Sequence, residues 1–546
     1  MDSVTRPKSA WDSLLRAVNA HKARNEMTAP ASHSLPAETA ALRMGAERDI
    51  ARDPKHEAAW ITLIESWLAG RVPRKAVEVA LRAIQVIPTS HRLQALLGLG
   101  QLSNGDFMEA EVTMDRLWSA SPNDLVLLTR IGEVAAAVGR YELARDAFEK
   151  ALFLRPKDPR LQFNLATALR NFGELARAES LYDSIIEHRP NDWEAYKNRT
   201  ELRRQTSERN HVPQLESALN RVGADWRGAV ALHYALGKEW EDLGKYDEAF
   251  AAYDAGAKLR RRHTQYDPAV DLQRLDRISR VFDAEWLQRQ IEGCPNDQPI
   301  FILGLPRAGS TLLERMLATH SNVVAGGELQ NFGVALVRLI QGMEPARQAD
   351  VIAASLRVNS LALGDAYIAS MPTRIKAKAR FIDKLPTNFL YVGLIAAALP
   401  RAKIIHIYRD PRDAGFGIYK TLFRQAYPFS YDLREIGRYI VGYTKLMEHW
   451  RNLLPGRMVD IPYEVLVEEP EEVLKSVLAG CGLSFEPACL EYFKNPTASS
   501  TASAVQVRQP MYRSSMQAWR RFERHLGPLL EELSVLQVPP VRSSLV

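Results

Sequence analysis

The stretch Pro299-Ile-Phe-Ile-Leu-Gly-Leu-Pro-Arg-Ala-Gly-Ser-Thr-Leu-Leu-Glu314 decides how the second half of the chain folds. Its first part, Ile300 to Leu303, is a short apolar run typical of a strand, and its last part has apolar residues at helical spacing. The glycine-bounded segment Gly304 to Thr311 lies between them. A strand, a glycine loop and a helix together present backbone N–H groups and a helix dipole to a phosphate or sulfate. The pattern predicts an anion-binding loop; the alternative is a chance turn between strand and helix.

The loop is similar to the phosphate loop G-x-x-x-x-G-K-[ST], with one difference. Ser310 stands where that pattern has its lysine. Arg307 is then the cation of the loop that can face a bound anion.

The composition restricts the class of protein. A chain of 546 residues is expected to hold more than one domain, because single cores stop growing at about 250–300 residues. Its net charge of +6 favours anionic ligands and is weak evidence for nucleic acid, so no nucleic-acid partner is expected. Three cysteines are too few for a disulfide framework and lack metal-ligand spacing, so no metal is expected. Without a signal peptide or a transmembrane run, the expected location is the cytoplasm.

The first half of the chain carries a regular repeat. Five prolines follow one another at intervals of 34 residues, namely Pro54, Pro88, Pro122, Pro156 and Pro190. Alanines and glycines keep the same step, and a 34-residue period of paired helices is typical of tetratricopeptide repeats. The sequence predicts a polar leader over residues 1–36, a repeat array over 37–262 with a small insertion between Thr200 and Trp226, and a linking helix over 263–297.

Such arrays usually bind peptides or partner proteins on a concave face. A peptide, a protein or another large molecule is therefore the expected partner of the array. An architectural or dimerising arm is the alternative, so the pattern is also compatible with a homodimer.

From residue 298 to residue 546 short apolar strands alternate with helical segments. The expected strands are Ile300–Leu303, Arg380–Asp383, Lys403–Tyr408 and Met458–Pro462. This order predicts a phosphate-loop-like α/β domain with a mainly parallel sheet, placed behind an all-α tetratricopeptide solenoid. Ligands of such sheets bind beyond the carboxyl ends of the strands, where the loop of Arg307 and a second arginine loop at Arg409 both fall.

The two loops together resemble a known family. Leu-Pro-Arg-Ala-Gly-Ser-Thr-Leu at 305–312 and Tyr-Arg-Asp-Pro-Arg-Asp at 408–413 are similar to the two cofactor loops of sulfotransferases. Protein-tyrosine sulfotransferases and bacterial sulfotransferases fused to tetratricopeptide repeats are the most similar groups. Four further pieces, in the same order as in that family, are Gly326–Glu328, Phe381–Asn388, Tyr463–Val467 and Thr501–Pro510. The resemblance implies 3′-phosphoadenosine 5′-phosphosulfate as the donor of a sulfuryl group, and no metal.

The resemblance also implies roles for individual residues. Glu328 corresponds to the catalytic base, Lys384 to the lysine that stabilises charge on the sulfuryl group and the bridging oxygen, and Ser503 to the hydroxyl that works with this lysine. Ser499, Ser500 and Thr501 are alternatives to Ser503. The residues expected to contact the donor are Arg307, Ala308, Gly309, Ser310 and Thr311 at the 5′-phosphosulfate, Arg409 and Gly417 at the 3′-phosphate, and Tyr463 and Arg508 near the nucleotide.

These residue types suit the chemistry independently of the resemblance. Sulfuryl transfer, like phosphoryl transfer, is helped mainly by positioning and by charge on the equatorial and leaving oxygens. Lysine and arginine supply that charge, and one carboxylate serves as base for an acceptor hydroxyl. Purely structural alternatives are a loop cap for Glu328, a pair with Asp383 for Lys384, and an ion pair with a neighbouring aspartate for Arg409.

One position departs from the family pattern. The family has a serine eight residues after the second-loop arginine to bond the 3′-phosphate, and this chain has Gly417. Loss of a hydrogen bond to a charged group weakens binding by about 1.5–3 kcal/mol, which is about tenfold to over a hundredfold. Weaker donor binding or an altered nucleotide preference is the expected consequence.

Two functions follow from different classes of protein. The first is a sulfotransferase whose repeat arm recruits a large hydroxyl-bearing acceptor. The second is a non-catalytic tetratricopeptide scaffold with a degenerate nucleotide-binding domain, which Gly417 favours. A phosphate-loop kinase or NTPase is disfavoured, because the loop lysine and an evident Mg²⁺ carboxylate are both missing.

Overall fold

The computed structural model describes residues 35–120, 122–290, 292–343, 350–423, 426–501, 503–511, 513 and 515–536. The leader predicted over residues 1–36 lies outside these ranges, apart from its last two residues. The chain packs as two compact units. The N-terminal unit comprises Leu169 and the described residues before it, with Ser370–Pro372, and the C-terminal unit comprises Arg170–Ala369 and the described residues from Thr373 onward.

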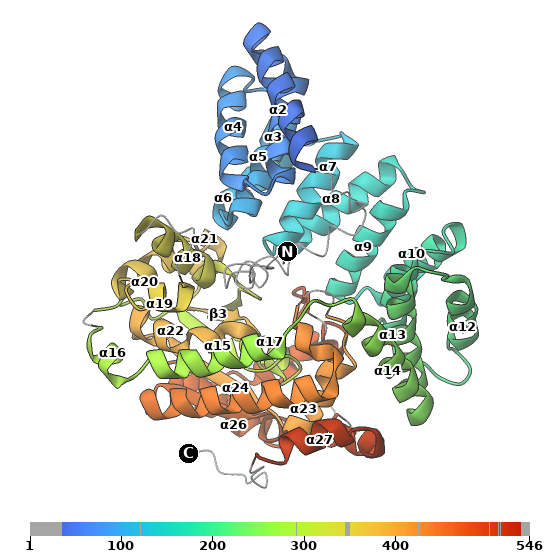
Figure 1. The fold of residues 1–546 in the computed structure, drawn as a ribbon, viewed down its shortest axis with the longest axis vertical. Helices are drawn as coiled ribbons and strands as arrows, with labels where there is room; N and C mark the ends of the chain where they lie inside the picture. Colours follow the sequence, from blue (N-terminus) through green and yellow to red (C-terminus); the bar gives the residue numbers. More distant parts are fainter. Residues whose placement is uncertain are drawn as a thin grey trace, which may run out of the picture. The chain divides into compact units, whose positions relative to one another are not determined.

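The N-terminal unit is an array of helical hairpins (Figure 1). Its helices are α2 (Leu35–Arg52), α3 (Glu57–Ala69), α4 (Pro73–Val86), α5 (His91–Asn104), α6 (Phe107–Ser119), α7 (Leu125–Ala137), α8 (Tyr141–Leu154) and most of α9 (Pro159–Phe172). Ser90 and Asp124 each accept a hydrogen bond from a backbone N–H in the first turn of the following helix, which explains why α5 and α7 begin there. Ala76 and Ala110 are fully buried, because the paired helices approach closely at these positions. The predicted tetratricopeptide solenoid is confirmed.

The repeats continue into the C-terminal unit. They comprise α10 (Leu175–His188), α11 (Trp193–Thr200), α12 (Val212–Arg221), α13 (Trp226–Asp242) and α14 (Tyr246–Arg262). The predicted insertion coincides with an irregular stretch at 201–211 and with α12. Two helices, α15 (Pro268–Val281) and α16 (Ala284–Gln288), then lead to the sheet, and α15 lies beside α24 (Leu433–Leu453) (Figure 1).

A five-stranded parallel sheet forms the centre of the C-terminal unit. Its strands are β1 (Pro299–Leu303), β2 (Val323–Ala325), β3 (Arg380–Lys384), β4 (Lys403–Tyr408) and β5 (Met458–Pro462), in the order β2-β3-β1-β4-β5. All four pairings are parallel, as the sequence predicts. Every residue of β1 is buried, because β1 is the central strand and helices cover its faces. The sequence did not predict the three-residue strand β2.

Helices and 3₁₀ turns surround this sheet. In chain order they are α17 (Ser310–Leu317), α18 (Asn331–Met343), α19 (Val351–Ser355), α20 (Ser360–Ala369), α21 (Thr373–Lys376), η2 (Pro386–Tyr391), α22 (Val392–Ala398), α23 (Pro411–Tyr419), η3 (Pro428–Tyr431), α24, α25 (Tyr463–Glu468), α26 (Pro470–Gly480), η4 (Pro487–Lys494), η5 (Gln506–Arg508), η6 (Ala518–His525) and α27 (Gly527–Leu533). The apolar core beneath the first loop joins β1, β4 and β5 to α17, α25 and α26.

The last repeat helices pack directly against the α/β part of the same unit. The Tyr419 hydroxyl donates to Asp254 of α14 over 2.9 Å, and Arg261 at the end of α14 forms an ion pair of 2.7 Å with Glu435 of α24. Lys420 and Glu241 of α13 form another, at 2.5 Å. The domain boundaries given by the sequence stay predictions, and the structure shows that the late repeats and the sheet share one compact unit.

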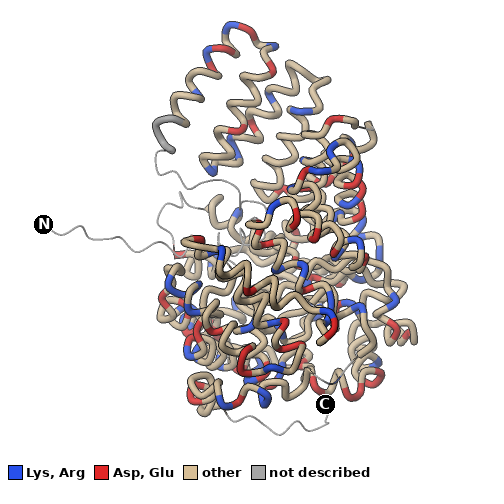
Figure 2. The backbone as a smooth tube through the Cα atoms, turned by 90° about the vertical axis from the view of Figure 1, so that its right-hand side faces the viewer, with Lys and Arg blue, Asp and Glu red and all other residues tan. Residues whose placement is uncertain are grey.

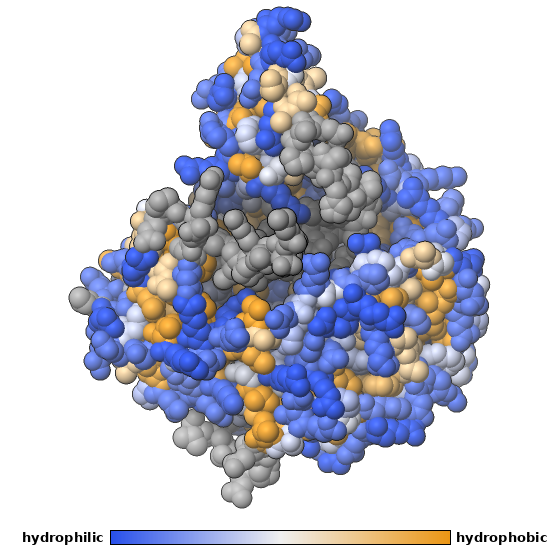
Figure 3. Space-filling view, in the orientation of Figure 1, coloured by the Kyte–Doolittle hydropathy of each residue, from blue (hydrophilic) through white to orange (hydrophobic). Residues whose placement is uncertain are grey.

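The surface carries both signs of charge. Basic and acidic residues are interspersed over the described part of the chain (Figure 2), and the face seen in Figure 3 is mainly hydrophilic with scattered hydrophobic groups. No described helix is both long enough and apolar enough to cross a lipid bilayer.

Candidate functional site

The candidate site lies beyond the carboxyl ends of β1 and β4. These strands are neighbours, and Leu303 at the end of β1 pairs with His406 of β4. From β1 the chain continues to β2 and β3 on one side, whereas β4 and β5 lie on the other. A parallel sheet binds its ligand at such a reversal of strand order. The loops that follow β1 and β4 are the two anion loops that the sequence predicts.

Two glycines allow the first loop to close onto its neighbours. Gly304 has φ 154° and its Cα faces the carbonyl oxygen of Ile407, so a Cβ there would overlap that oxygen. Gly309 has φ 104°, and a Cβ at this position would overlap the ring of Tyr463. Gly309 directly precedes α17, whose first N–H groups have no partner within the helix. The loop therefore places helix-start amides and a positive dipole end beyond the carboxyl end of β1.

Arg307 spans from this loop to a C-terminal segment of the chain. Its backbone has φ 68°, which is uncommon for a residue with a side chain and marks a conformation imposed by the surroundings. Its guanidinium donates to the Ser503 hydroxyl over 2.6 Å and to the Gln506 side-chain oxygen over 3.1 Å. Thr501 lies 3.3 Å from the Thr311 hydroxyl. The structure thus brings the predicted Arg307 and Ser503 together, although 196 residues separate them in the sequence.

Lys384, the last residue of β3, lies between two carboxylates. Its ammonium donates to Glu328 over 2.8 Å and stands 3.9 Å from Glu314. The Lys384 side chain is 1% exposed, whereas that of Glu328 is 31% exposed and can be reached from outside. Backbone pairing sets this geometry, because residues 326 and 327 extend β2 along β3: Gly326 donates to Ile382 and Lys384 to Gly327.

Glu314 is a site residue that the sequence analysis missed. It lies in α17, is buried, and its Oε1 has no hydrogen-bond partner among the described residues. Burial raises its pKa, the charge of Glu328 raises it further, and Lys384 opposes the shift. The available signal was spacing: Glu314 follows Ser310 by four residues, so both lie on the loop-facing side of the helix.

Asp383 supports the end of β3 from the opposite side. It is fully buried, accepts from the Tyr367 hydroxyl over 2.9 Å and from the Asn388 amide over 3.1 Å. Burial raises the pKa of Asp383 to about 7, against the opposing effect of these two donors. The structural alternative for Lys384, a pair with Asp383, is not what the geometry shows: the close partner of Lys384 is Glu328.

Arg409 occupies the second loop. Its guanidinium donates to the backbone oxygen of Ser515, lies 3.5 Å from Asp413 and stands 4.7 Å from the centre of the Tyr463 ring. Its Nε is buried and has no hydrogen-bond partner among the described residues. Asp413 mainly accepts backbone N–H groups of residues 517 and 519, at 2.7 and 2.9 Å. Burial raises the pKa of Asp413, and the charge of Arg409 opposes this.

Gly417 and Tyr463 lie beside the arginines of the two loops. A Cβ on Gly417 would lie 3.4 Å from the Cβ of Arg307, so the helix α23 that starts at the second loop reaches the first loop here. The Tyr463 hydroxyl lies 3.0 Å from that of Ser515. Arg307 is thus linked to Ser503 and to α23, and Arg409 to Tyr463, while Lys384 pairs with Glu328 at the end of β3. Arg508 bonds to the carbonyl oxygens of Asn171, over 2.5 Å, and Thr497, over 2.9 Å.

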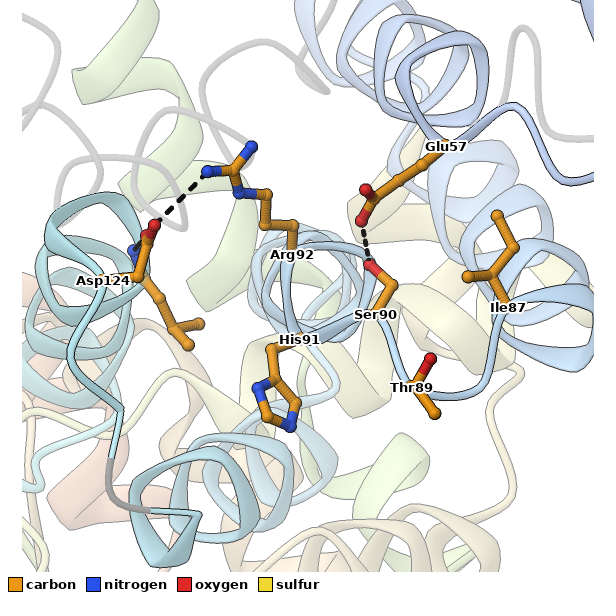
Figure 4. A pocket seen from close by; sticks show the side chains of 8 residues that line it. Glu57, Ile87, Thr89, Ser90, His91, Arg92 and Asp124 are labelled. Carbon is orange, nitrogen blue, oxygen red and sulfur yellow. Dashed lines mark hydrogen bonds and ion pairs between the residues drawn. The ribbon is translucent and has the colours of Figure 1, made fainter.

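The N-terminal unit contains a separate shallow pocket at the starts of α3, α5 and α7 (Figure 4). Two pairs of its polar side chains interact: Ser90 donates to Glu57, and Arg92 donates to Asp124 over 3.3 Å. Among the described residues, no group of three or more histidine, cysteine, aspartate or glutamate side chains could hold a metal ion.

Comparison with known proteins agrees with this geometry. Residues 299–487 match the model of the sulfotransferase family, and residues 129–192 match that of the tetratricopeptide repeat. The chain combines a sulfotransferase-family domain with tetratricopeptide repeats. The matched part of the sulfotransferase domain contains both anion loops, Glu328 and Lys384.

Individual relatives cover parts of the chain. An uncharacterized protein of Aquifex aeolicus is 34% identical over 382 residues, which is 68% of this chain and 49% of that protein. The protein-tyrosine sulfotransferase of Drosophila melanogaster is 25% identical over 247 residues, 40% of this chain and 46% of that enzyme. This chain thus spans about half the length of both relatives. A solved sulfotransferase domain from the olefin synthase of Synechococcus PCC 7002 aligns with 42% of this chain and 89% of its own, at 22% identity and a TM-score of 0.32.

Proposed function

We propose that the protein transfers a sulfuryl group from 3′-phosphoadenosine 5′-phosphosulfate to an acceptor hydroxyl. The observation that carries the proposal is the pair of Lys384 and Glu328, 2.8 Å apart at the carboxyl end of β3. It lies next to the strand that leads into the Arg307 loop. Transfer of a sulfuryl group from one oxygen to another needs a base for the acceptor hydroxyl and a cation for the developing negative charge. The carboxylate of Glu328 and the ammonium of Lys384 are suited to these two roles.

The residues of the two loops fit this donor. The donor supplies the sulfuryl group and carries phosphate groups at two ends, so it needs two anion sites. The helix-start amides with Arg307 suit one of them, and Arg409 suits the other. The buried Nε of Arg409 lacks a hydrogen-bond partner among the described residues. This supports a hydrogen bond from Nε to an oxygen of the donor's phosphate. Tyr463 would flank the bound nucleotide.

Each residue of the site has a separate role in the proposed transfer. Glu328 takes the proton from the acceptor hydroxyl as the acceptor oxygen bonds to sulfur. Lys384 stabilises the charge that develops on the bridging oxygen as its bond to sulfur breaks. Arg307, with Ser503, orients the transferred group. Glu314, buried behind Lys384, helps to hold this lysine in place.

The acceptor is proposed to be a peptide, a protein or another large molecule gathered by the repeats. One curated relative is named a protein-tyrosine sulfotransferase, so tyrosine-containing peptides are the first acceptors to test.

The described cysteines, Cys294, Cys481 and Cys489, are unpaired, which supports a reducing, cytoplasmic setting.

The test is transfer of radiolabelled sulfate from the donor to a tyrosine-containing peptide library by the full chain. Glu328→Gln keeps the shape of the side chain and removes the base, so transfer should fall about 10²–10⁴-fold. Lys384→Met should reduce it by about 10²–10³-fold. Lys475→Met on α26 is the matched control, because Lys475 also pairs with glutamates but on the surface. Unchanged transfer in both site variants would overturn the assigned roles.

The second candidate is a scaffold that binds partners and senses a nucleotide without turnover. Gly417 favours it, since no side chain at this position can bond a 3′-phosphate. It predicts partner binding with no labelled product from any acceptor, and a product that depends on Glu328 would exclude it.

A further inference from the structure

The segment 497–509 connects the nucleotide site with the repeat array. The middle of this segment contacts the first anion loop, where Ser503 and Gln506 accept from Arg307. Near its two ends the segment contacts α9: Arg508 donates to the carbonyl oxygen of Asn171 over 2.5 Å, and the Ser499 N–H donates to the same oxygen over 2.9 Å. Both groups of contacts lie within the C-terminal unit.

The carbonyl of Asn171 is well suited to hold an arginine. Asn171 is the second-last residue of α9, and the last carbonyls of a helix have no partner within it. The carboxyl end of a helix also carries a partial negative charge, which favours a cation. Arg508 therefore satisfies the carboxyl end of a repeat helix, and Ser499 adds a second donor.

Gly173 makes room for the arginine. It has φ +83°, which favours glycine, and a Cβ there would lie 2.5 Å from the Cδ of Arg508. The equivalent turn glycine between α13 and α14, Gly244, has φ +75° but would meet nothing within 4 Å. The left-handed backbone thus favours glycine at both Gly173 and Gly244. At Gly173 the absence of a Cβ also leaves room for Arg508 of the segment 497–509.

Arg508 stays beside Asn171 despite electrostatic repulsion from the guanidinium of Arg315. Its partner Thr497 also accepts from Arg315, over 3.0 Å, so the buried guanidinium of Arg315 and the half-buried guanidinium of Arg508 converge on one carbonyl. Burial lowers the pKa of Arg315 to about 10, and the charge of Arg508 contributes. Burial likewise lowers the pKa of Arg508. An arginine in this position needs a compensating partner, and the end of α9 provides it.

We propose that Arg508 is a positioning residue that uses the end of repeat helix α9 to fix the segment holding Arg307. The tetratricopeptide array is then a structural part of the nucleotide site in addition to any role in recruitment. This inference rests on the proposed function only in that the site binds a 3′-phosphorylated nucleotide.

The other side of Arg307 is also held by repeat helices, through α23. Gly417 of α23 lies beside the Arg307 stem, where an added Cβ would be 3.4 Å from the Arg307 Cβ, and two residues later Tyr419 donates to Asp254 of α14. The Tyr419 carbonyl in turn accepts from Tyr234 of α13, over 3.2 Å. Both elements that border Arg307 therefore end on repeats, which agrees with the proposal.

The test compares Arg508→Ala, Arg508→Lys, Gly173→Ala and Gly244→Ala in the full chain. One measurement is hydrogen–deuterium exchange of the backbone over residues 497–509, and the other is calorimetric titration with 3′-phosphoadenosine 5′-phosphate. Arg508→Ala and Gly173→Ala should speed exchange in this segment and weaken nucleotide binding at least tenfold. Arg508→Lys should restore part of both. Gly244→Ala introduces a similar left-handed strain without touching Arg508, and it should leave both unchanged.

A double variant tests whether the two positions act through one contact. Gly173→Ala in the Arg508→Ala background should weaken binding no further, because the contact is already lost. Unchanged exchange in Arg508→Ala, or additive effects in the double variant, would overturn the proposal. If the wild-type chain binds no nucleotide, the proposed function fails, and the exchange data still decide whether Arg508 fixes the segment.

Discussion

Asp383 gives the C-terminal unit a pH-dependent stability. Its pKa is about 7 in the folded chain, where burial raises it, against 3.8 for an ordinary aspartate. Between these values the folded chain keeps a proton that the unfolded chain has released, so stability falls as pH rises through this window. The slope from one such group is at most about 1.4 kcal/mol per pH unit.

We expect Asp383→Asn to remove this part of the slope. Urea unfolding should be measured at several pH values from about 4.5 to about 8. The free energy of unfolding should fall less with rising pH in the variant than in the wild type. The control is Asp276→Asn, an exposed carboxylate of α15, whose curve should run parallel to the wild type. A variant with the wild-type slope would mean that Asp383 is ionised in the folded chain.

Gly417 is a position where one substitution should improve the site. A Cβ there would be in ordinary contact with Arg307, so serine fits without displacing it. We expect Gly417→Ser to tighten binding of 3′-phosphoadenosine 5′-phosphate about tenfold or more, since a hydrogen bond to a charged group contributes about 1.5–3 kcal/mol. Titration calorimetry measures this directly.

Gly415→Ser provides the matched control within the same helix. Its Cβ would lie 3.0 Å from two carbon atoms of Leu529, so the substitution should lower stability and leave the affinity unimproved. Equal nucleotide affinities of Gly417→Ser and the wild type would show that position 417 does not face the phosphate.

At the scale of the elements, the first loop depends on the contact of Gly309 with Tyr463. Gly309→Ala would combine left-handed strain with overlap of the tyrosine ring, which also stacks against Arg409. We expect at least about a tenfold loss of nucleotide affinity, because both anion loops would shift from their positions. Calorimetry on the purified variant checks this.

Gly456→Ala separates strain from overlap in that experiment. Gly456 has φ +71° and open space around it, so alanine should cost only the conformational term of about 1–2 kcal/mol and leave binding intact. Equal affinities of the Gly309 and Gly456 variants would contradict the role assigned to the first loop.

The sequence predicted the long and periodic elements well. The 34-residue period identified the repeat helices, and the four apolar runs correspond to β1, β3, β4 and β5. Strand β2 was missed because three residues are too short for an alternating pattern to be visible. Its position nevertheless matters, since residues 326 and 327 after it carry Glu328 to Lys384.

At the scale of the whole molecule, the site combines residues that no local pattern connects. Motifs and family resemblance predicted Arg307, Glu328, Lys384 and Arg409 as site residues. The partners of these residues could not be predicted in this way. Gln506 is 199 positions from Arg307, and its contact exists only once the segment 497–509 has folded over the loop. The bond of Arg508 to the carbonyl oxygen of Asn171 in a repeat helix was likewise not predicted.

The arrangement of the late repeats explains why the two parts of the chain belong together. Residues from Arg170 onward share a compact unit with the sheet, and their helices contact α23 and the segment 497–509. A sulfotransferase domain separated at residue 297 would lose these supports, so nucleotide binding is best measured on the full chain.

The most direct test of the central claim is calorimetric titration of the full chain with 3′-phosphoadenosine 5′-phosphate, beside ATP and adenosine 5′-phosphosulfate. We predict binding of the 3′-phosphorylated nucleotide in the micromolar range, no comparable binding of the other two, and its loss in Arg409→Ala. Arg409→Lys, which keeps the charge beside Asp413, controls for folding. Absence of binding by the wild type, or equal binding of all three nucleotides, would contradict the proposed donor and favour the scaffold.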